Sequence, residues 1–126
     1  MKQVLHTEKA PAAIGPYAQG WKAGNLIYTS GQLGIDMETG RLAEAVEAQA
    51  RASMRNVGEI LKAAGASYGD VVKTTIFVKD LADFKTVNTV YAEFFDGDYP
   101  ARSCVQVAAL PMGGLVEIEA VAMVEA

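Results

Sequence analysis

The sequence of 126 residues contains a single cysteine, Cys104, and a single histidine, His6. One cysteine excludes a disulfide within the chain and is typical of a protein from a reducing compartment. These two residues are also too few for a zinc site built from Cys and His ligands in one chain. A Ser-His-Asp triad would have to use His6, close to the N-terminus, so that chemistry is not favoured.

Long apolar runs and clusters of basic residues are missing as well. No apolar stretch approaches the roughly 18 residues that a membrane helix needs, and residues 1–6 lack the apolar core of a signal peptide. Eleven Lys and Arg stand against 15 Asp and Glu, giving a net charge of −4, and the basic residues are scattered. Phosphate backbones require clustered basic residues. We therefore expect a cytoplasmic protein whose partners are neither nucleic acids nor membranes.

The remaining composition, with half of the residues hydrophobic, is that of one folded domain. No repeat, linker or low-complexity segment divides the chain, so residues 1–126 are expected to form a single domain. The stretches Gly15-Pro16 and Gly31 to Gly34 lack the spacing of a phosphate loop or of a dinucleotide-binding fingerprint.

Hydrophobic periodicity predicts strands in the first forty residues and then helices that alternate with strands. Gly24-Asn25 predicts the turn of a hairpin within residues 21–30. Apolar residues at three- and four-residue spacing from Ala45 to Ala64 predict a helix, which Gly65 caps. Its predicted buried face comprises Val46, Ala50, Ser53, Val57, Ile60, Leu61 and Ala64.

A strand is predicted next, over residues 71–79, with Val72, Thr74, Ile76 and Val78 on one face. A second helix follows, capped by Asp80 or Asp83 and ended by Gly97 and Pro100. Its apolar side is expected to carry Phe84, Val87, Tyr91, Phe94 and Phe95. Strands over residues 102–108 and 115–124 complete the prediction.

The order ββ-α-β-α-ββ implies an α+β domain in which one mixed sheet is backed by two helices. Two helices cover only one face of such a sheet. The other face is apolar too, at Phe77, Val121 and Met123. Further copies of the same chain are the simplest cover for that face, so we expect a homo-oligomer.

Arg102 and Glu117, in the last two strands, are the best candidates for chemistry. Alternation places Arg102 and Cys104 on one face of their strand, and Glu117 and Glu119 on one face of theirs. If the two strands are neighbours, the arginine can hold a substrate carboxylate in one cleft while the glutamate acts as a base toward water. The residues alone favour a plainer alternative, a cross-strand ion pair worth about 0.2–1 kcal/mol.

Three more residues have both a functional and an ordinary interpretation. Cys104 has no obvious base beside it and is more often a small buried hydrophobe than a nucleophile. Tyr17 can donate a hydrogen bond to a substrate, but a surface or core tyrosine is commoner. Asn88, inside the second predicted helix, is more often a solvated or packing residue than a ligand contact.

Several blocks of the sequence together resemble the reactive intermediate deaminase family, also called the RidA or YjgF family. Each block alone is a weak signal, whereas their common order and spacing are specific. The blocks span almost the whole chain and are Ala13–Gln19, Ser30–Gln32, Val71–Asp80, Asp83-Phe84 with Val87-Asn88, Tyr99–Val105 and Leu115–Ala120.

The resemblance implies a chorismate mutase-like fold, assembled as a homotrimer with a central barrel and with clefts between subunits. It implies hydrolysis of 2-imino acids, formed from enamines such as 2-aminoacrylate and 2-aminocrotonate, to 2-keto acids and ammonium without metal or cofactor. Arg102 would then clamp the carboxylate and Glu117 would position and polarise water. The pocket would be lined by Tyr17, Ser30, Gly31, Asn88 and Cys104, with Gly31 and Cys104 acting through backbone groups.

Two other functions remain as alternatives. A non-catalytic sensor of small carboxylates, or a protein-binding module, could use the same fold. Such a binder needs Arg102 but not Glu117, so the presence of both favours the enzyme. An endoribonuclease activity has also been attached to the family, and here the acidic charge argues against it.

Overall fold

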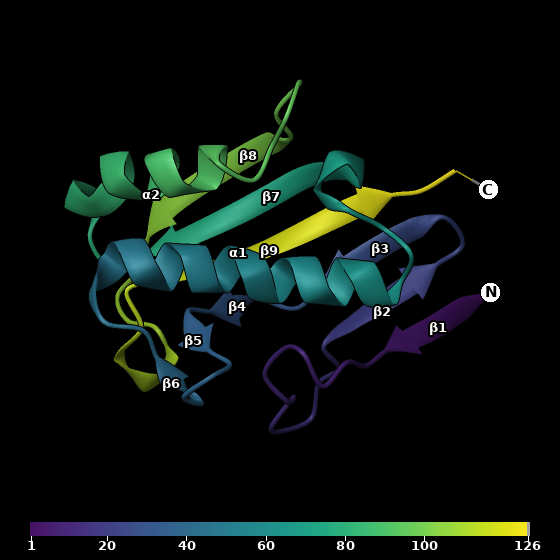
Figure 1. The fold of residues 1–126 in the computed structure, drawn as a ribbon, viewed down its shortest axis with the longest axis horizontal. Coiled ribbons are helices and arrows are strands. Elements are labelled where there is room, and N and C mark those ends of the chain that lie inside the picture. Colours follow the sequence, from purple (N-terminus) through teal and green to yellow (C-terminus); the bar gives the residue numbers. More distant parts are fainter. Residues whose placement is uncertain (126) are drawn as a thin grey trace.

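Two helices lie across one face of a sheet in the computed structural model, which describes residues 1–125 (Figure 1). The helices are α1 (Ala45–Ala63) and α2 (Phe84–Ala92). Within the described residues, neither they nor the short 3₁₀ turns are long and apolar enough to cross a membrane. The strands are β1 (Lys2–Leu5), β2 (Gly20–Ala23), β3 (Leu26–Thr29), β4 (Gln32–Leu33), β5 (Ile35–Asp36), β6 (Arg41–Leu42), β7 (Val71–Val78), β8 (Ala101–Gln106) and β9 (Val116–Met123).

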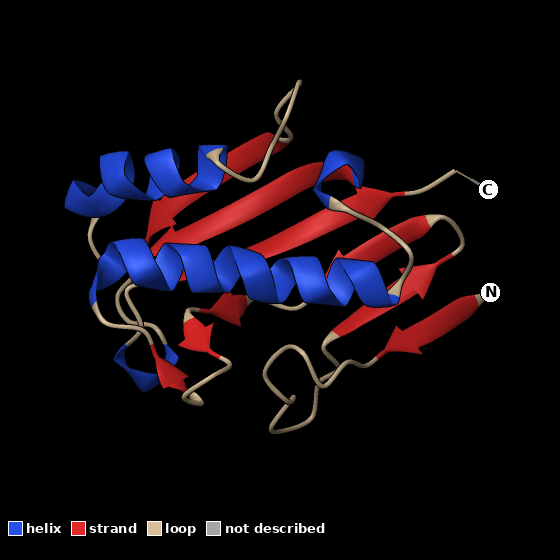
Figure 2. Ribbon diagram, in the orientation of Figure 1, coloured by secondary structure: helices blue, strands red, loops and turns tan. Residues whose placement is uncertain are grey.

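The main sheet has the order β1-β2-β3-β9-β7-β8, with β4 paired to β9, while β5 and β6 form a separate ribbon (Figure 2). Only β7 and β8 are parallel, because α2 carries the chain back over the sheet between them. The predicted mixed sheet with two helices is therefore confirmed. The predicted hairpin is confirmed too, since Gly24-Asn25 joins Ala23 to its partner Leu26.

Helix α1 ends where the glycine predicts. Gly65 has a φ of +80° and donates its N–H to the Lys62 carbonyl at 3.0 Å, and the Ala66 N–H reaches the Leu61 carbonyl at 2.9 Å. This pair of bonds is a Schellman motif, which satisfies the last carbonyls of the helix. The predicted inner face is buried from Ala50 to Leu61, so α1 packs firmly on the sheet.

Strand β7 differs from the prediction at its first residues. Val72 is exposed and does not share the buried face of Thr74, Ile76 and Val78. A β-bulge between Val71 and Lys73 shifts the register, so Val71 points inward in its place.

Helix α2 is shorter than predicted. It ends at Ala92, not at Gly97, so Phe94 and Phe95 pack on the core from the turn beyond the helix. Phe84, in the first turn, is 38% exposed and does not belong to the core. The Phe84 side chain is therefore available for a role other than core packing.

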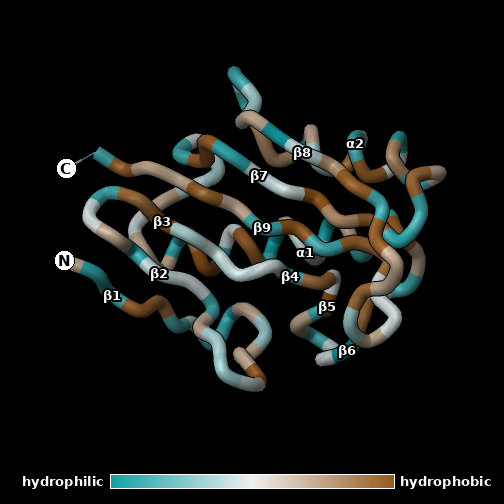
Figure 3. The backbone as a smooth tube through the Cα atoms, turned by 180° about the vertical axis from the view of Figure 1, so that it is seen from behind, coloured by the Kyte–Doolittle hydropathy of each residue, from teal (hydrophilic) through white to brown (hydrophobic). Residues whose placement is uncertain are grey.

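Within residues 1–125, no helix covers the opposite face of the sheet (Figure 3). Register places large apolar residues on this uncovered face, and each is between 39% and 52% exposed. They are Val4, Trp21, Tyr28, Val105 and Met123. The uncovered apolar face that the sequence predicts is thus present, and the oligomer expected to cover it remains a prediction.

Candidate functional site

Arg102 lies on the helix-covered side of β8, next to Thr74 of β7. Its Nη1 donates a hydrogen bond of 2.6 Å to the Oδ1 of Asn88 on α2. The ring centroids of Phe84 and Tyr91 lie 5.4 and 5.2 Å from the guanidinium carbon. A cavity of about 470 Å³ opens beside these groups and is lined by Asn88, Tyr91, Ala92, Tyr99, Pro100 and Arg102.

No carboxylate within residues 1–125 pairs with the Arg102 guanidinium. The ion pairs in this part of the chain are Arg51 with Glu93 at 2.9 Å and Lys62 with Glu59 at 3.5 Å. The half-buried guanidinium contacts neutral groups, so its positive charge is available to bind an anionic ligand. Its planar fork of donors matches a carboxylate.

Cys104 lies two residues along the same face of β8, as predicted. Burial raises the pKa of its thiol, and the nearby Arg102 charge only partly opposes this. The side chain is therefore a protonated thiol at neutral pH, whereas the nucleophilic form of cysteine is the thiolate. Cys104 packs against the hydrophobic core and is not among the residues that line the cavity beside Arg102, so the structure agrees with its interpretation as a small hydrophobe.

Glu117 of β9 lies on the uncovered face, between Phe77 of β7 and Leu33 of β4. Burial raises the pKa of the Glu117 carboxyl, and the like charge of Glu119 raises it further. Gly31 passes so close that a Cβ built there would lie 2.8 Å from the carboxyl carbon of Glu117. A glycine at position 31 is therefore what leaves room for this carboxyl group.

Ser30 is tied to the loop that precedes β2. Its hydroxyl donates a hydrogen bond of 2.6 Å to the Ala18 carbonyl, so toward a ligand it can only accept. Tyr17, in the same loop, is 53% exposed and lies outside the cavity beside Arg102. The buried side chain of Gln19 holds this loop together by bonding backbone groups of Thr7 and Pro11.

One chain does not bring Arg102 and Glu117 into one cleft. Strand β7 separates β8 from β9, so the two strands are not neighbours, as a shared cleft would require. Arg102 aligns with Thr74, and Thr74 with Ala120, which lies an odd number of residues from Glu117. The two side chains therefore leave the sheet on opposite faces, and the alternative of a cross-strand ion pair is wrong as well.

The residues around Arg102 and those around Glu117 instead form two separate groups. The arginine half-site consists of Arg102 with Phe84, Asn88 and Tyr91 around its guanidinium. The glutamate half-site is separate from it and consists of Glu117, Gly31 and the adjacent Ser30.

The sequence interpretation missed the role of two aromatic residues. Phe84 and Tyr91 were assigned to the core side of the second helix, yet both face Arg102. Their spacing to Asn88, four residues after Phe84 and three before Tyr91, places all three on one helical face. That pattern was the available signal.

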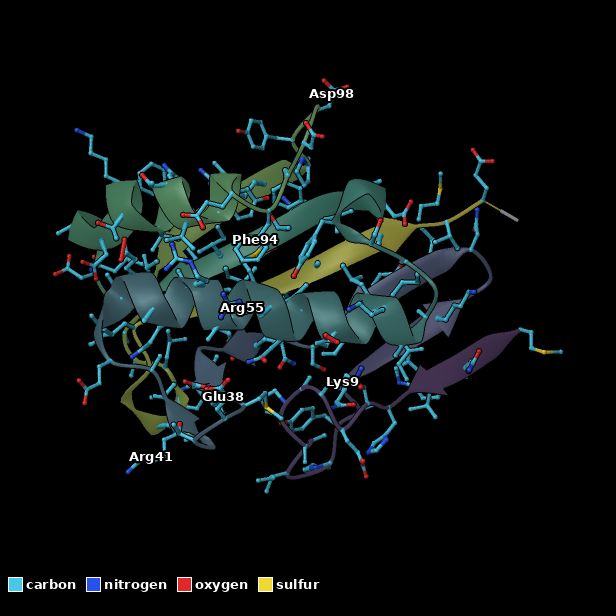
Figure 4. The ribbon with its side chains drawn as sticks, viewed as in Figure 1. Lys9, Glu38, Arg41, Arg55, Phe94 and Asp98 are labelled. Carbon is cyan, nitrogen blue, oxygen red and sulfur yellow. The ribbon has the colours of Figure 1, made fainter. Side chains whose placement is uncertain are left out.

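A second cavity, of about 500 Å³, lies along the outer side of α1, with Lys9, Glu38 and Arg55 in its wall (Figure 4). None of the predicted site residues lines it. Among the residues that the structure describes, no group of three or more His, Cys, Asp or Glu side chains is placed to hold a metal ion.

Comparison with known proteins gives close relatives over the whole chain. Residues 7–124 match the family described as Endoribonuclease L-PSP. A 2-iminobutanoate/2-iminopropanoate deaminase of Salmonella typhimurium is 55% identical over 126 residues, covering 98% of each protein. Reactive Intermediate Deaminase A, chloroplastic, of Arabidopsis thaliana is 57% identical over 96% of this chain, which spans 65% of the plant protein. The crystal structure of Escherichia coli TdcF with bound serine matches with a TM-score of 0.94 at 48% identity, covering 98% of this chain and 99% of that one.

Proposed function

Because the chain belongs to the reactive intermediate deaminase family, whose family model is described as Endoribonuclease L-PSP, we propose that it hydrolyses 2-imino acids to 2-keto acids and ammonium. The names of its relatives support this activity, and one observation in the chain carries it. That observation is the uncompensated guanidinium of Arg102 in the wall of a cavity of about 470 Å³. Such a group recognises the carboxylate that all these substrates share.

Arg102 holds the substrate carboxylate through the donors that Asn88 leaves free. The Nη1 group of Arg102 donates one hydrogen bond to the side-chain Oδ1 of Asn88, and a guanidinium has five N–H donors in total. Two parallel N–H bonds to a carboxylate orient the substrate as well as bind it. The imine carbon next to the carboxylate is thereby fixed in position.

Glu117 acts on the attacking water. Water adds to the electrophilic imine carbon, so that a C–O bond forms, the C=N bond becomes a single bond and Glu117 takes a proton from the water. The proton passes to the nitrogen, the C–N bond breaks as the hydroxyl becomes the carbonyl of the keto acid, and the nitrogen leaves as ammonium. A carboxylate that accepts the proton of this water contributes about 10²–10⁴-fold, in addition to the gain from positioning. The raised pKa of Glu117 makes it a better proton acceptor than an ordinary glutamate.

The two half-sites come together when copies of the chain assemble. In one chain they lie on opposite faces of the sheet, so one chain alone does not complete the site. The arginine half-site lies at β8, an edge strand of the main sheet, and the glutamate half-site lies on the uncovered face. A homotrimer that buries this face, as the family resemblance implies, would place each arginine half-site against the glutamate half-site of a neighbouring copy.

A coupled assay tests the activity. A serine or threonine dehydratase generates the enamine, and keto acid release is followed over the first seconds with wild type and with Arg102→Ala. We expect wild type to accelerate release and the variant to lose the acceleration. If wild type has no effect with either amino acid, the enzyme interpretation is wrong, and keto acid binding by that protein would then favour the carboxylate sensor.

A further inference from the structure

We propose that Phe84, Tyr91 and Asn88 form a neutral clamp that positions the Arg102 guanidinium while leaving its positive charge free for the substrate. This inference rests on the carboxylate-binding role of Arg102 in the proposed function. It adds Phe84 and Tyr91 as positioning residues and moves Asn88 from substrate contact to arginine support.

The contacts around the guanidinium carry the first step. One nitrogen is fixed by the Asn88 carbonyl at 2.6 Å, and the two rings lie 5.4 and 5.2 Å from the central carbon. An aromatic face within about 6 Å attracts a cation through its quadrupole. Three side chains of α2 therefore contact the guanidinium.

The three groups that contact the guanidinium are uncharged. A carboxylate would hold the guanidinium more strongly, but it would also compete with the substrate for the same charge and donors. Amide and aromatic groups carry no net charge, and no ion pair within residues 1–125 involves Arg102. The clamp therefore fixes the geometry of the guanidinium without neutralising it.

Tyr91 is itself held rigidly, which makes its ring a firm support. Its hydroxyl lies 2.6 Å from Thr74 Oγ1 in the buried core, and its ring lies 4.8 Å from that of Phe95. Burial raises the pKa of Tyr91, against smaller opposing effects of Thr74 and Arg102. The phenol thus stays neutral at physiological pH and does not compete for the guanidinium charge.

Matched pairs of variants separate the ring from the rest of each side chain. Phe84→Leu and Tyr91→Leu remove a ring, whereas Phe84→Tyr and Tyr91→Phe keep it. The Phe84 pair is decisive for folding, because Phe84 is 38% exposed and its loss opens no core cavity. Binding of 2-oxobutanoate is measured by calorimetric titration, and kcat and KM come from the coupled assay.

We expect each leucine variant to raise the Kd and the KM about three- to tenfold, the range of a partly desolvated cation–π contact. The value of kcat should stay within about twofold, because the rings act through Arg102, and Arg102 holds the carboxylate equally before and during reaction. The ring-retaining variants should bind like wild type. Leucine variants that bind like wild type, or ring-retaining variants that are equally impaired, would overturn the clamp.

A measurement without ligand keeps the clamp separate from the proposed function. The Nε–H resonance of Arg102, identified by its loss in Arg102→Ala, should be shifted upfield by the flanking rings and should move back in Phe84→Leu. If the shift is present but no deaminase activity is found, the proposed function fails and the clamp stands. If activity is found but neither the resonance nor the Kd depends on the rings, the clamp fails alone.

Discussion

The replacement of Asn88 by Asp tests whether the uncompensated charge of Arg102 is what binds the substrate. The variant is nearly isosteric and puts a carboxylate oxygen where the amide oxygen now lies, 2.6 Å from Nη1. A substrate carboxylate on the other donors would lie about 6 Å from the new charge, and two unit charges at that distance repel by about 3 kcal/mol at an effective dielectric constant of about 20. Solvent in the open cavity screens part of this, so we expect a loss of about 1–3 kcal/mol in binding.

That loss corresponds to a Kd for 2-oxobutanoate raised about five- to 150-fold. Stability should move the other way or stay constant, because a charge-assisted hydrogen bond replaces a neutral one. Asn88→Ser is the matched control, since its shorter side chain withdraws the acceptor from Nη1 without adding charge, and it should weaken binding by less than Asn88→Asp. Titration calorimetry and urea unfolding of the three proteins give both quantities. Equal binding by wild type and Asn88→Asp, or a serine variant as impaired as the aspartate variant, would refute the charge argument.

Three further predictions follow from single contacts. Gly31→Ala should lower kcat about ten- to hundredfold by displacing the Glu117 carboxyl, while 2-oxobutanoate still binds at Arg102. An unchanged kcat would show that the new methyl group does not displace this carboxyl. Glu119→Gln should move the acid limb of the pH profile of kcat/KM to lower pH, because activity needs ionised Glu117. Burial is the larger cause of the raised pKa of Glu117 and remains in the variant, whereas the like charge of Glu119 is the smaller cause and is removed. Gly58→Ala should lower the free energy of unfolding by about 1–3 kcal/mol in urea, although alanine favours helices. The new Cβ would clash with the Tyr68 hydroxyl, which donates a hydrogen bond of 2.8 Å to the Met54 carbonyl. Gly69→Ala is the control, because a Cβ at that position would meet no atom closer than 3.9 Å.

The parts of the fold that local chemistry determines could be predicted from the sequence. Helix α1 combines a long apolar period with a glycine at its end, and the hairpin has a two-residue turn with glycine first. The strands β4, β5 and β6 have two residues each, too few to show any period, and were not predicted as separate elements. The exposure of Val72 depends on a bulge that one strand alone does not reveal.

The candidate site was predictable in its residues more than in its arrangement. Alternation correctly placed Arg102 and Cys104 on one face of β8. It could not show that β9 inserts between β3 and β7, because that pairing joins segments far apart in the chain and separates β8 from the strand that follows it. The prediction that Arg102 and Glu117 share one cleft depended on their strands being neighbours, and they are not.

The aromatic residues of α2 illustrate the same limit. Apolar residues at helical spacing usually pack in the core, and Val87 and Tyr91 do so. The spacing of Phe84, Asn88 and Tyr91 groups them on one face of the helix, but it does not show that a cation from β8 lies against both rings. The sequence of a helix shows which residues share a face, but it does not show which strand packs against that face.

The central claim, that the site is completed between copies of the chain, is tested most directly by mixing two inactive variants. Arg102→Ala and Glu117→Gln, carrying different tags, are co-expressed, and assemblies that carry both tags are purified and assayed. A site between copies predicts recovered activity, because in a trimer that holds both variants the intact arginine of one meets the intact glutamate of the other at about one interface in three. Mixed assemblies that form but remain as inactive as the two parents, or a chain that is monomeric by light scattering, would contradict the claim.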